Sequence, residues 1–149
     1  MKTLIGMLAL AALLSTATYN NSLNGSQTAA PEAAGIALNL NASGDLPGMI
    51  KVNLQRDGSN VTGGTFRMTV LPQNADASSS ERGELVATVT GGTLTLTPEG
   101  TLASVSGVQL TIQSGAGEFA AVTSGTGTLS ARVDSENPSQ LSGTLVLNF

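Results

Sequence analysis

From Ile36 to its last residue, this chain alternates apolar and polar residues with a period of two, in one short segment after another. In the segment 108–112, VQLTI, a branched apolar residue occupies every second position, with Gln or Thr between. Successive side chains of a β-strand point to opposite faces, so this pattern predicts strands with one buried face. No segment after residue 34 has the apolar period of an amphipathic helix. The alternation therefore predicts an all-β fold.

Turn-forming residues separate the alternating segments at regular intervals. The segments 44–48, GDLPG, and 57–60, DGSN, are rich in residues that adopt tight turns. The breaks delimit about eight or nine strands, which is the spacing expected of all-β barrels and sandwiches. We expect an antiparallel barrel of about eight strands, because closure removes exposed sheet edges. A β-sandwich is the alternative, and either fold would be a single domain over residues 35–149.

Two near-identical segments stand out, VTGGTF over 61–66 and VTGGTL over 89–94. Paired glycines between β-branched residues are typical of a hairpin connection, so Gly91-Gly92 is expected to form a turn between two strands. Gly63-Gly64 has two interpretations. It is either the same kind of turn or a bulge within a bent strand of a closed barrel.

Residues 1–17 have the pattern of a secretory signal peptide. Lys2 precedes an apolar run, and Ser15-Thr16-Ala17 forms a cleavage site with small residues. The run is shorter than the about 18 apolar residues that a membrane-spanning helix needs. Residues 18–34 are rich in Asn, Ser, Ala and Gln without periodicity, so we expect a flexible leader there. The chain is therefore predicted to be exported, to the medium, the periplasm or the cell surface.

The composition excludes several classes of chemistry. The chain has no histidine and no cysteine, which rules out Ser-His-Asp and Cys-His catalysis and the common zinc sites. The carboxylate pairs at 81 and 84 and at 134 and 136 have the character of solvated loop charges. A net charge of −4 and 3% aromatic residues also disfavour nucleic acid as a partner. No catalytic residue, metal ligand or cofactor site is assigned, and no catalysis is evident.

Arg67 interrupts an apolar alternation. It stands between Phe66 and Met68, so it points to the face opposite theirs. If that face lined the lumen, Arg67 could pair with Glu84 or Glu118 and bind an anionic or oxygenated ligand. Charged side chains are rarely fully buried, so the interpretation in which Arg67 faces water is favoured. These three charged residues are the ligand-binding candidates that the sequence offers.

A glycine-rich hairpin over residues 108–129 carries a family resemblance. An alternating strand is followed by SGAGEF at 114–119, then by Gly125 and Gly127 and another strand. This hairpin resembles that of the allene oxide cyclase and dirigent proteins. The resemblance implies an eight-stranded antiparallel barrel, often oligomeric, that acts on oxidised lipids or phenoxy radicals in its interior. None of that family's functional residues can be placed here. The GDLPG turn is similar to one in small exported bacterial proteins of unassigned function.

Three functions fit the sequence. The first is an exported barrel that binds a small apolar or amphipathic ligand in its lumen, which requires an internal cavity. The second is a structural protein of the cell envelope or the extracellular space, which predicts a filled interior and self-association into homo-oligomers. The third is a small outer-membrane barrel, suggested by the alternating last strand that ends in Phe149. Against the third, a membrane barrel needs two aromatic girdles and an apolar outer band, so we expect no membrane partner.

Overall fold

The computed structural model describes residues 17–29, 35–72, 81–98, 102–137 and 140–149. The predicted signal peptide therefore lies outside the described residues, apart from Ala17. Within the described ranges, no helix is long and apolar enough to cross a membrane.

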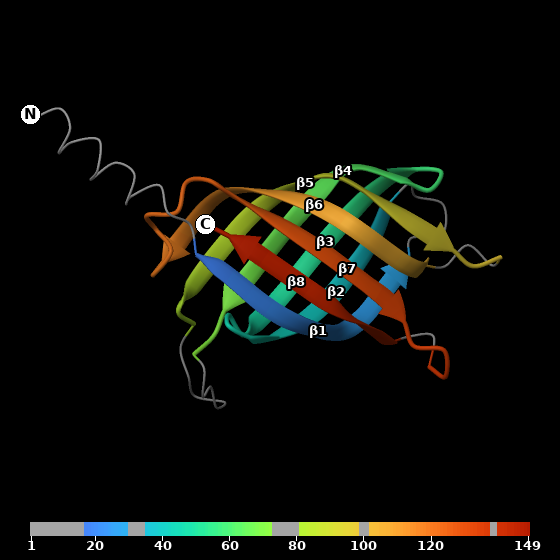
Figure 1. Ribbon diagram of the computed structural model, residues 1–149, viewed down its shortest axis with the longest axis horizontal. Helices are drawn as coiled ribbons and strands as arrows, with labels where there is room; N and C mark the ends of the chain where they lie inside the picture. The colour runs from blue at the N-terminus through green and yellow to red at the C-terminus, as the bar shows by residue number, and fades with distance from the viewer. Residues whose placement is uncertain (1–16, 30–34, 73–80, 99–101, 138–139) are drawn as a thin grey trace, which may run out of the picture.

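Eight strands form one closed antiparallel barrel, in which each strand pairs with the next and β1 pairs with β8. Figure 1 shows the closure, with the blue β1 beside the red β8. The predicted barrel of about eight strands is confirmed, and the sandwich alternative is wrong. The strands are β1 Thr18–Ala29, β2 Gly35–Gly44, β3 Gly48–Asp57, β4 Asn60–Val70, β5 Gly83–Leu96, β6 Leu102–Gly117, β7 Gly125–Val133 and β8 Gln140–Asn148.

The first strand corrects the predicted N-terminal leader. Residues 18–34 were expected to be flexible, but β1 occupies 18–29 and pairs along both of its edges, with β2 and with β8. Its inward positions include the polar Asn21 and the partly buried Gly25 beside the buried Leu23, so the apolar alternation is too weak to read. Backbone pairing with two neighbours, rather than an apolar face, fixes this strand. The barrel therefore begins at Thr18, and residues 30–34 lie outside the described residues.

The two VTGG segments lie inside strands, at places where the strand register is irregular. Gly64 in β4 has a φ of 139° and Gly92 in β5 has a φ of 138°, both in the region that favours glycine. The β4–β5 register runs from Asn60–Thr93 to Thr65–Thr88, so the two segments face each other between these pairs. The predicted turn at Gly91-Gly92 is therefore wrong, because β5 continues through it. The bulge interpretation of Gly63-Gly64 fits the irregular β3–β4 register there.

The apolar faces of β2 to β8, together with Leu23 of β1, fill the lumen. The buried apolar side chains are each at most 7% exposed, and Phe66, Met68 and Leu85 in the middle of the wall are 0–1% exposed. A side chain that lined a water-sized void would retain accessible surface, so these values describe a packed interior. The alternation read from the sequence thus corresponds to an apolar inside and a polar outside.

Uncharged polar side chains cover most of the outer wall. Among the described residues, Met49 at 55% exposure is the large apolar side chain that stands out. Outward residues that pair directly across neighbouring strands form a polar row around seven of the strands. Asn53 and Thr65 are hydrogen-bonded at one end of the row, and Thr18 and Asn148 at the other. The row runs through Asn53, Thr65, Thr88, Thr111, Thr126, Asn148 and Thr18.

Aromatic rings gather at one end of the barrel, where the chain ends. The rings of Tyr19 and Phe149 stack at 4.6 Å between centroids, and Phe119 meets Phe149 edge-on at 6.0 Å. The Ala17 amide donates to the Phe149 carbonyl oxygen at 3.0 Å, and the Phe149 amide donates back at 3.2 Å. The contact between β1 and β8 therefore continues to the last residue, and the rings cover the core beneath.

Candidate functional site

The ligand-binding candidates from the sequence lie on the outside of the barrel. The Arg67 side chain is 64% exposed, and its Nε lies 3.1 Å from Glu84 Oε1. Glu118 pairs instead with Arg82, whose Nε is 3.3 Å from Glu118 Oε2 and whose guanidinium lies 5.8 Å from the Phe119 ring centroid. Arg67 therefore faces water, as the favoured interpretation expected, and the ion pair with Glu84, which was considered only for a lumen-facing Arg67, forms on the outer wall instead. None of the three candidates lines the hollows described below.

Replacing Arg67 with Ala is expected to lower the free energy of unfolding by less than about 1 kcal/mol, because an exposed ion pair contributes little. Arg82→Ala is the informative companion, since that side chain also packs over an aromatic ring and is only 29% exposed. Urea denaturation of both variants measures the difference. A larger loss of unfolding free energy in Arg67→Ala than in Arg82→Ala would contradict the assignment of Arg67 as a water-facing residue.

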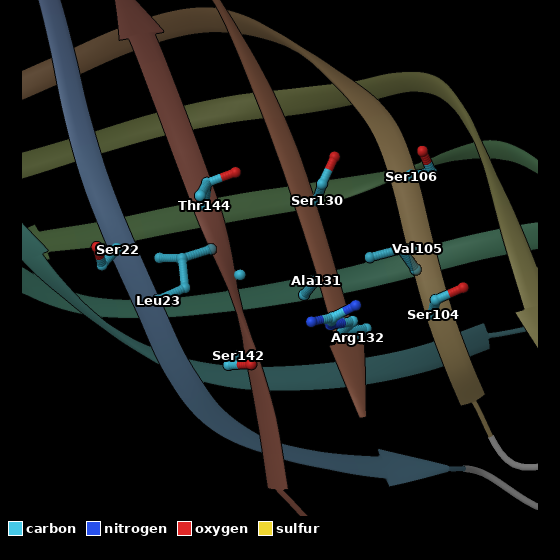
Figure 2. A pocket seen from close by; sticks show the side chains of 11 residues that line it. Ser22, Leu23, Ser104, Val105, Ser106, Ser130, Ala131, Arg132, Ser142 and Thr144 are labelled. Atoms are coloured by element: carbon cyan, nitrogen blue, oxygen red, sulfur yellow. The ribbon is translucent and has the colours of Figure 1, made fainter. Parts of the chain in front are cut away.

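A hollow of about 610 Å³ lies on the outer wall, across β6, β7, β8 and β1. We call it the serine-lined hollow. Figure 2 shows its polar side chains in two rows, one from Ser22 to Ser106 and one from Ser142 through Arg132 to Ser104. The hydroxyl groups that line it belong to Ser22, Ser104, Ser106, Ser130, Ser142 and Thr144.

Strand register and small side chains create this hollow. Arg132 on β7 pairs with Ser104 on β6 and with Ser142 on β8, which brings three outward side chains together. Beneath them, Ala131 pairs with Gly143, and a Cβ added to Gly143 would lie 2.9 Å from the Ala131 Cβ. A barrel wall has the shape of a hyperboloid, which is concave along its length. Small residues leave that concavity unfilled.

One hydroxyl of the hollow is held in place, and others are available to a ligand. A bulge in β6 between Val105 and Val108 turns the Gly107 amide outward, where it donates to Ser130 Oγ at 3.0 Å. Among the described residues, the hydroxyls of Ser104 and Ser142 have no hydrogen-bond partner in the protein. A free hydroxyl both donates and accepts, so the wall of the hollow can bind either kind of group on a ligand.

Arg132 is the charged side chain of this hollow, and it is exposed. In the part of the chain that the structure describes, it has no carboxylate partner, whereas Arg67 and Arg82 each have one. Its cross-strand neighbours are uncharged serines. A guanidinium presents five donors in a planar fork that matches a carboxylate, sulfate or phosphate group. The hollow therefore combines hydroxyl groups with one anion-binding group.

The serines of this hollow are visible in the sequence, but the sequence does not show that they lie close together in the fold. Outward positions of strands are expected to be polar, so serines there carry no signal of a site. The hollow needs the register of β6 with β7, and of β8 with β1, which sequence alternation does not determine. In addition, β1 was not predicted as a strand. Within the described residues, no three carboxylates lie close enough together to hold a metal ion.

Comparisons with protein-family models, with curated proteins and with solved structures find no match for this chain. The hairpin that resembles the allene oxide cyclase and dirigent proteins consists of the end of β6, a turn over 118–121 and β7. That resemblance stays a prediction, and the function is argued from the residues of the chain itself.

Proposed function

We propose that this chain is an exported, non-catalytic barrel that binds a hydroxyl-rich ligand with an anionic group on its outer wall. The observation that carries this proposal is Arg132, unpaired within the described residues and placed in a hollow lined by six hydroxyl side chains. The signal-peptide pattern of residues 1–17 supports export.

The filled lumen supports the outer wall as the place of function. A ligand inside the barrel, as in the lumen-binding hypothesis or in chemistry of the allene oxide cyclase type, needs an internal cavity. The packed interior gives no support to either. It does agree with the structural-protein alternative, which remains the second candidate and predicts self-association.

The outward faces of the strands disfavour the outer-membrane alternative. Such a barrel needs an apolar outward band about 25 Å tall with aromatic girdles. Here most outward positions of β5, β6 and β7 are Thr, Ser and Gln, with the charged Glu84 and Arg132 among them, and aromatic rings gather at one end of the wall. The function is therefore proposed for a barrel surrounded by water.

Binding in this hollow would rely on charge and hydrogen bonds rather than on apolar burial. Arg132 would hold the anionic group, and Ser104 and Ser142 beside it would exchange hydrogen bonds with neighbouring hydroxyls. The site is shallow and open to water, so each contact competes with solvent. A single small ligand is therefore expected to bind weakly.

D-Glucuronate, which combines hydroxyls with one carboxylate, is expected to cause saturable amide shifts at Ser104, Ser130 and Ser142 in an NMR titration. D-Glucose, which lacks the carboxylate, should bind at least about tenfold more weakly, since hydrogen bonds to charged groups contribute about 1.5–3 kcal/mol. Arg132→Gln should weaken D-glucuronate binding by a similar factor.

The matched control is Lys51→Gln, which removes an exposed cation from β3, outside the hollow. It should leave the D-glucuronate titration unchanged. Equal losses of D-glucuronate affinity in Arg132→Gln and Lys51→Gln would show that D-glucuronate responds only to the overall charge of the protein. Equal binding of glucose and glucuronate would remove the role assigned to Arg132.

A further inference from the structure

We infer that the serine-lined hollow is the middle of a longer trough that holds an extended polysaccharide in which charged and neutral sugars alternate. This inference rests on the proposed function and specifies its ligand. A hollow of about 370 Å³ adjoins the central one and shares Arg132 and Ser142 with it. Another, of about 350 Å³, adjoins it on the other side and shares Ser22 and Thr144. The shared lining residues place the three hollows next to one another along β8.

The trough follows β8, with β7 on one side and β1 on the other. Its floor includes the outward positions Ser142, Thr144 and Val146. At a strand rise of about 3.3 Å per residue, Ser142 and Val146 are about 13 Å apart, and the outer hollows extend beyond both. A single sugar fills only part of such a length, so the shape favours a chain of sugars.

The turn between β2 and β3 bounds one end of the trough and is held against β1 by two hydrogen bonds. Asn21 is 5% exposed, and its Oδ1 accepts a hydrogen bond from the Leu46 amide at 2.8 Å. Its Nδ2 has no acceptor among the described residues. Asp45 fixes the same turn against β1, because its Oδ2 accepts from the Asn20 amide at 2.9 Å. Asn21 points into the barrel, so these two bonds fix the turn that bounds the trough, and its Nδ2 lies out of reach of a ligand on the outer wall.

The charges along the trough favour alternation in the ligand. Arg132 lies where the central hollow meets the smaller one at the end of β7, and Asp134 lines that smaller hollow. Toward the β2–β3 turn, the lining includes the uncharged Asn20, Ser43 and Thr144. A polymer with a carboxylate on every sugar would place negative charge beside Asp134, which repels it. A polymer with neutral sugars between the charged ones avoids that contact.

The fold also favours a polysaccharide over an acidic peptide. Extended peptides commonly bind by adding a strand to an open sheet edge, and the barrel closes its sheet by pairing β1 with β8. Helical peptides need a groove of large apolar side chains, whereas six of the eleven residues that line this hollow carry hydroxyl groups. Hydroxyl groups on the wall match hydroxyl groups on sugars.

The test uses hyaluronan oligosaccharides, which alternate glucuronate with a neutral amino sugar, and measures their affinities by calorimetry or NMR. The hexasaccharide is expected to bind at least about tenfold more tightly than the disaccharide, because it adds contacts along the trough. Ser43→Trp places a bulky ring in the hollow near the β2–β3 turn, so it should remove most of this gain. D-Glucuronate binding to the same variant reports whether the central hollow is intact.

The matched control is Asn39→Trp, an exposed position on the same strand outside the trough. In this variant the affinity should increase with oligosaccharide length as much as it does in the unmodified chain. Equal affinities for all lengths, with D-glucuronate still bound, would overturn the trough and leave the proposed function standing. Loss of D-glucuronate binding in the unmodified chain would overturn both. Equally tight binding of a poly-glutamate peptide would overturn the assignment of the ligand as a polysaccharide.

Discussion

A chain shortened to begin at Gly35 is expected to lose the cooperative unfolding transition of the chain that begins at Thr18. The shortening removes β1, whose register covers nine positions with β2 and nine with β8. At about 1 kcal/mol net per backbone hydrogen bond, two ladders of this length are comparable with the whole stability of a domain, about 5–15 kcal/mol. Removal also exposes β2 and β8 as sheet edges, which promotes aggregation.

Circular dichroism melts and size-exclusion chromatography of the two chains measure this loss. Adding a synthetic peptide of residues 17–29 to the chain that begins at Gly35 should restore strand signal and solubility, because the peptide supplies the missing strand. A shortened chain that stays monomeric with an unchanged melting midpoint would show that β1 is dispensable. In that case the barrel would not depend on closure through β1 and β8.

Sequence alternation predicted most of the wall, and the exception is instructive. A strand is readable when its inward positions are apolar, as in β3, where Ile50, Val52 and Leu54 are all 1% exposed. In β1 the inward positions 21, 23 and 25 are Asn, Leu and Gly, and most of the rest are polar. That strand is held by backbone pairing on both edges, which leaves no side-chain pattern to read.

The candidate site depended on information that a sequence does not hold. The pair of Arg67 and Glu84 was considered only for a lumen-facing arginine, and it forms on the outside, one diagonal step across β4 and β5. The serine-lined hollow instead depends on which outward positions meet across four strands. A one-residue slip of β7 against β8 would separate Arg132 from Ser142 and send alternate side chains inward.

Gly92→Ala is expected to lower the free energy of unfolding by about 3 kcal/mol, whereas Gly91→Ala should change it by less than about 1 kcal/mol. Gly92 has a φ of 138°, and an added Cβ would lie 2.8 Å from the Val108 Cα. The Gly91 backbone lies outside the restricted region, and an added Cβ there would meet nothing within 4 Å. The two glycines are adjacent, so the variants differ only in backbone conformation and local space.

The other VTGG segment supplies an independent repeat of this experiment. Gly64 has nearly the same φ as Gly92, and a Cβ there would clash with the Asn53 carbonyl oxygen, so Gly64→Ala should be at least as harmful. In Gly63→Ala the added Cβ would lie 3.3 Å from the flexible end of Gln55 and at an ordinary van der Waals distance of 3.9 Å from the Val89 carbonyl oxygen, so this variant should be mild. Denaturant midpoints of the four variants give the comparison. If the second glycine of each pair is the sensitive one, both segments bend their strands for closure. Equal effects within each pair would mean that the glycines serve only as small residues, and the curvature would need another cause.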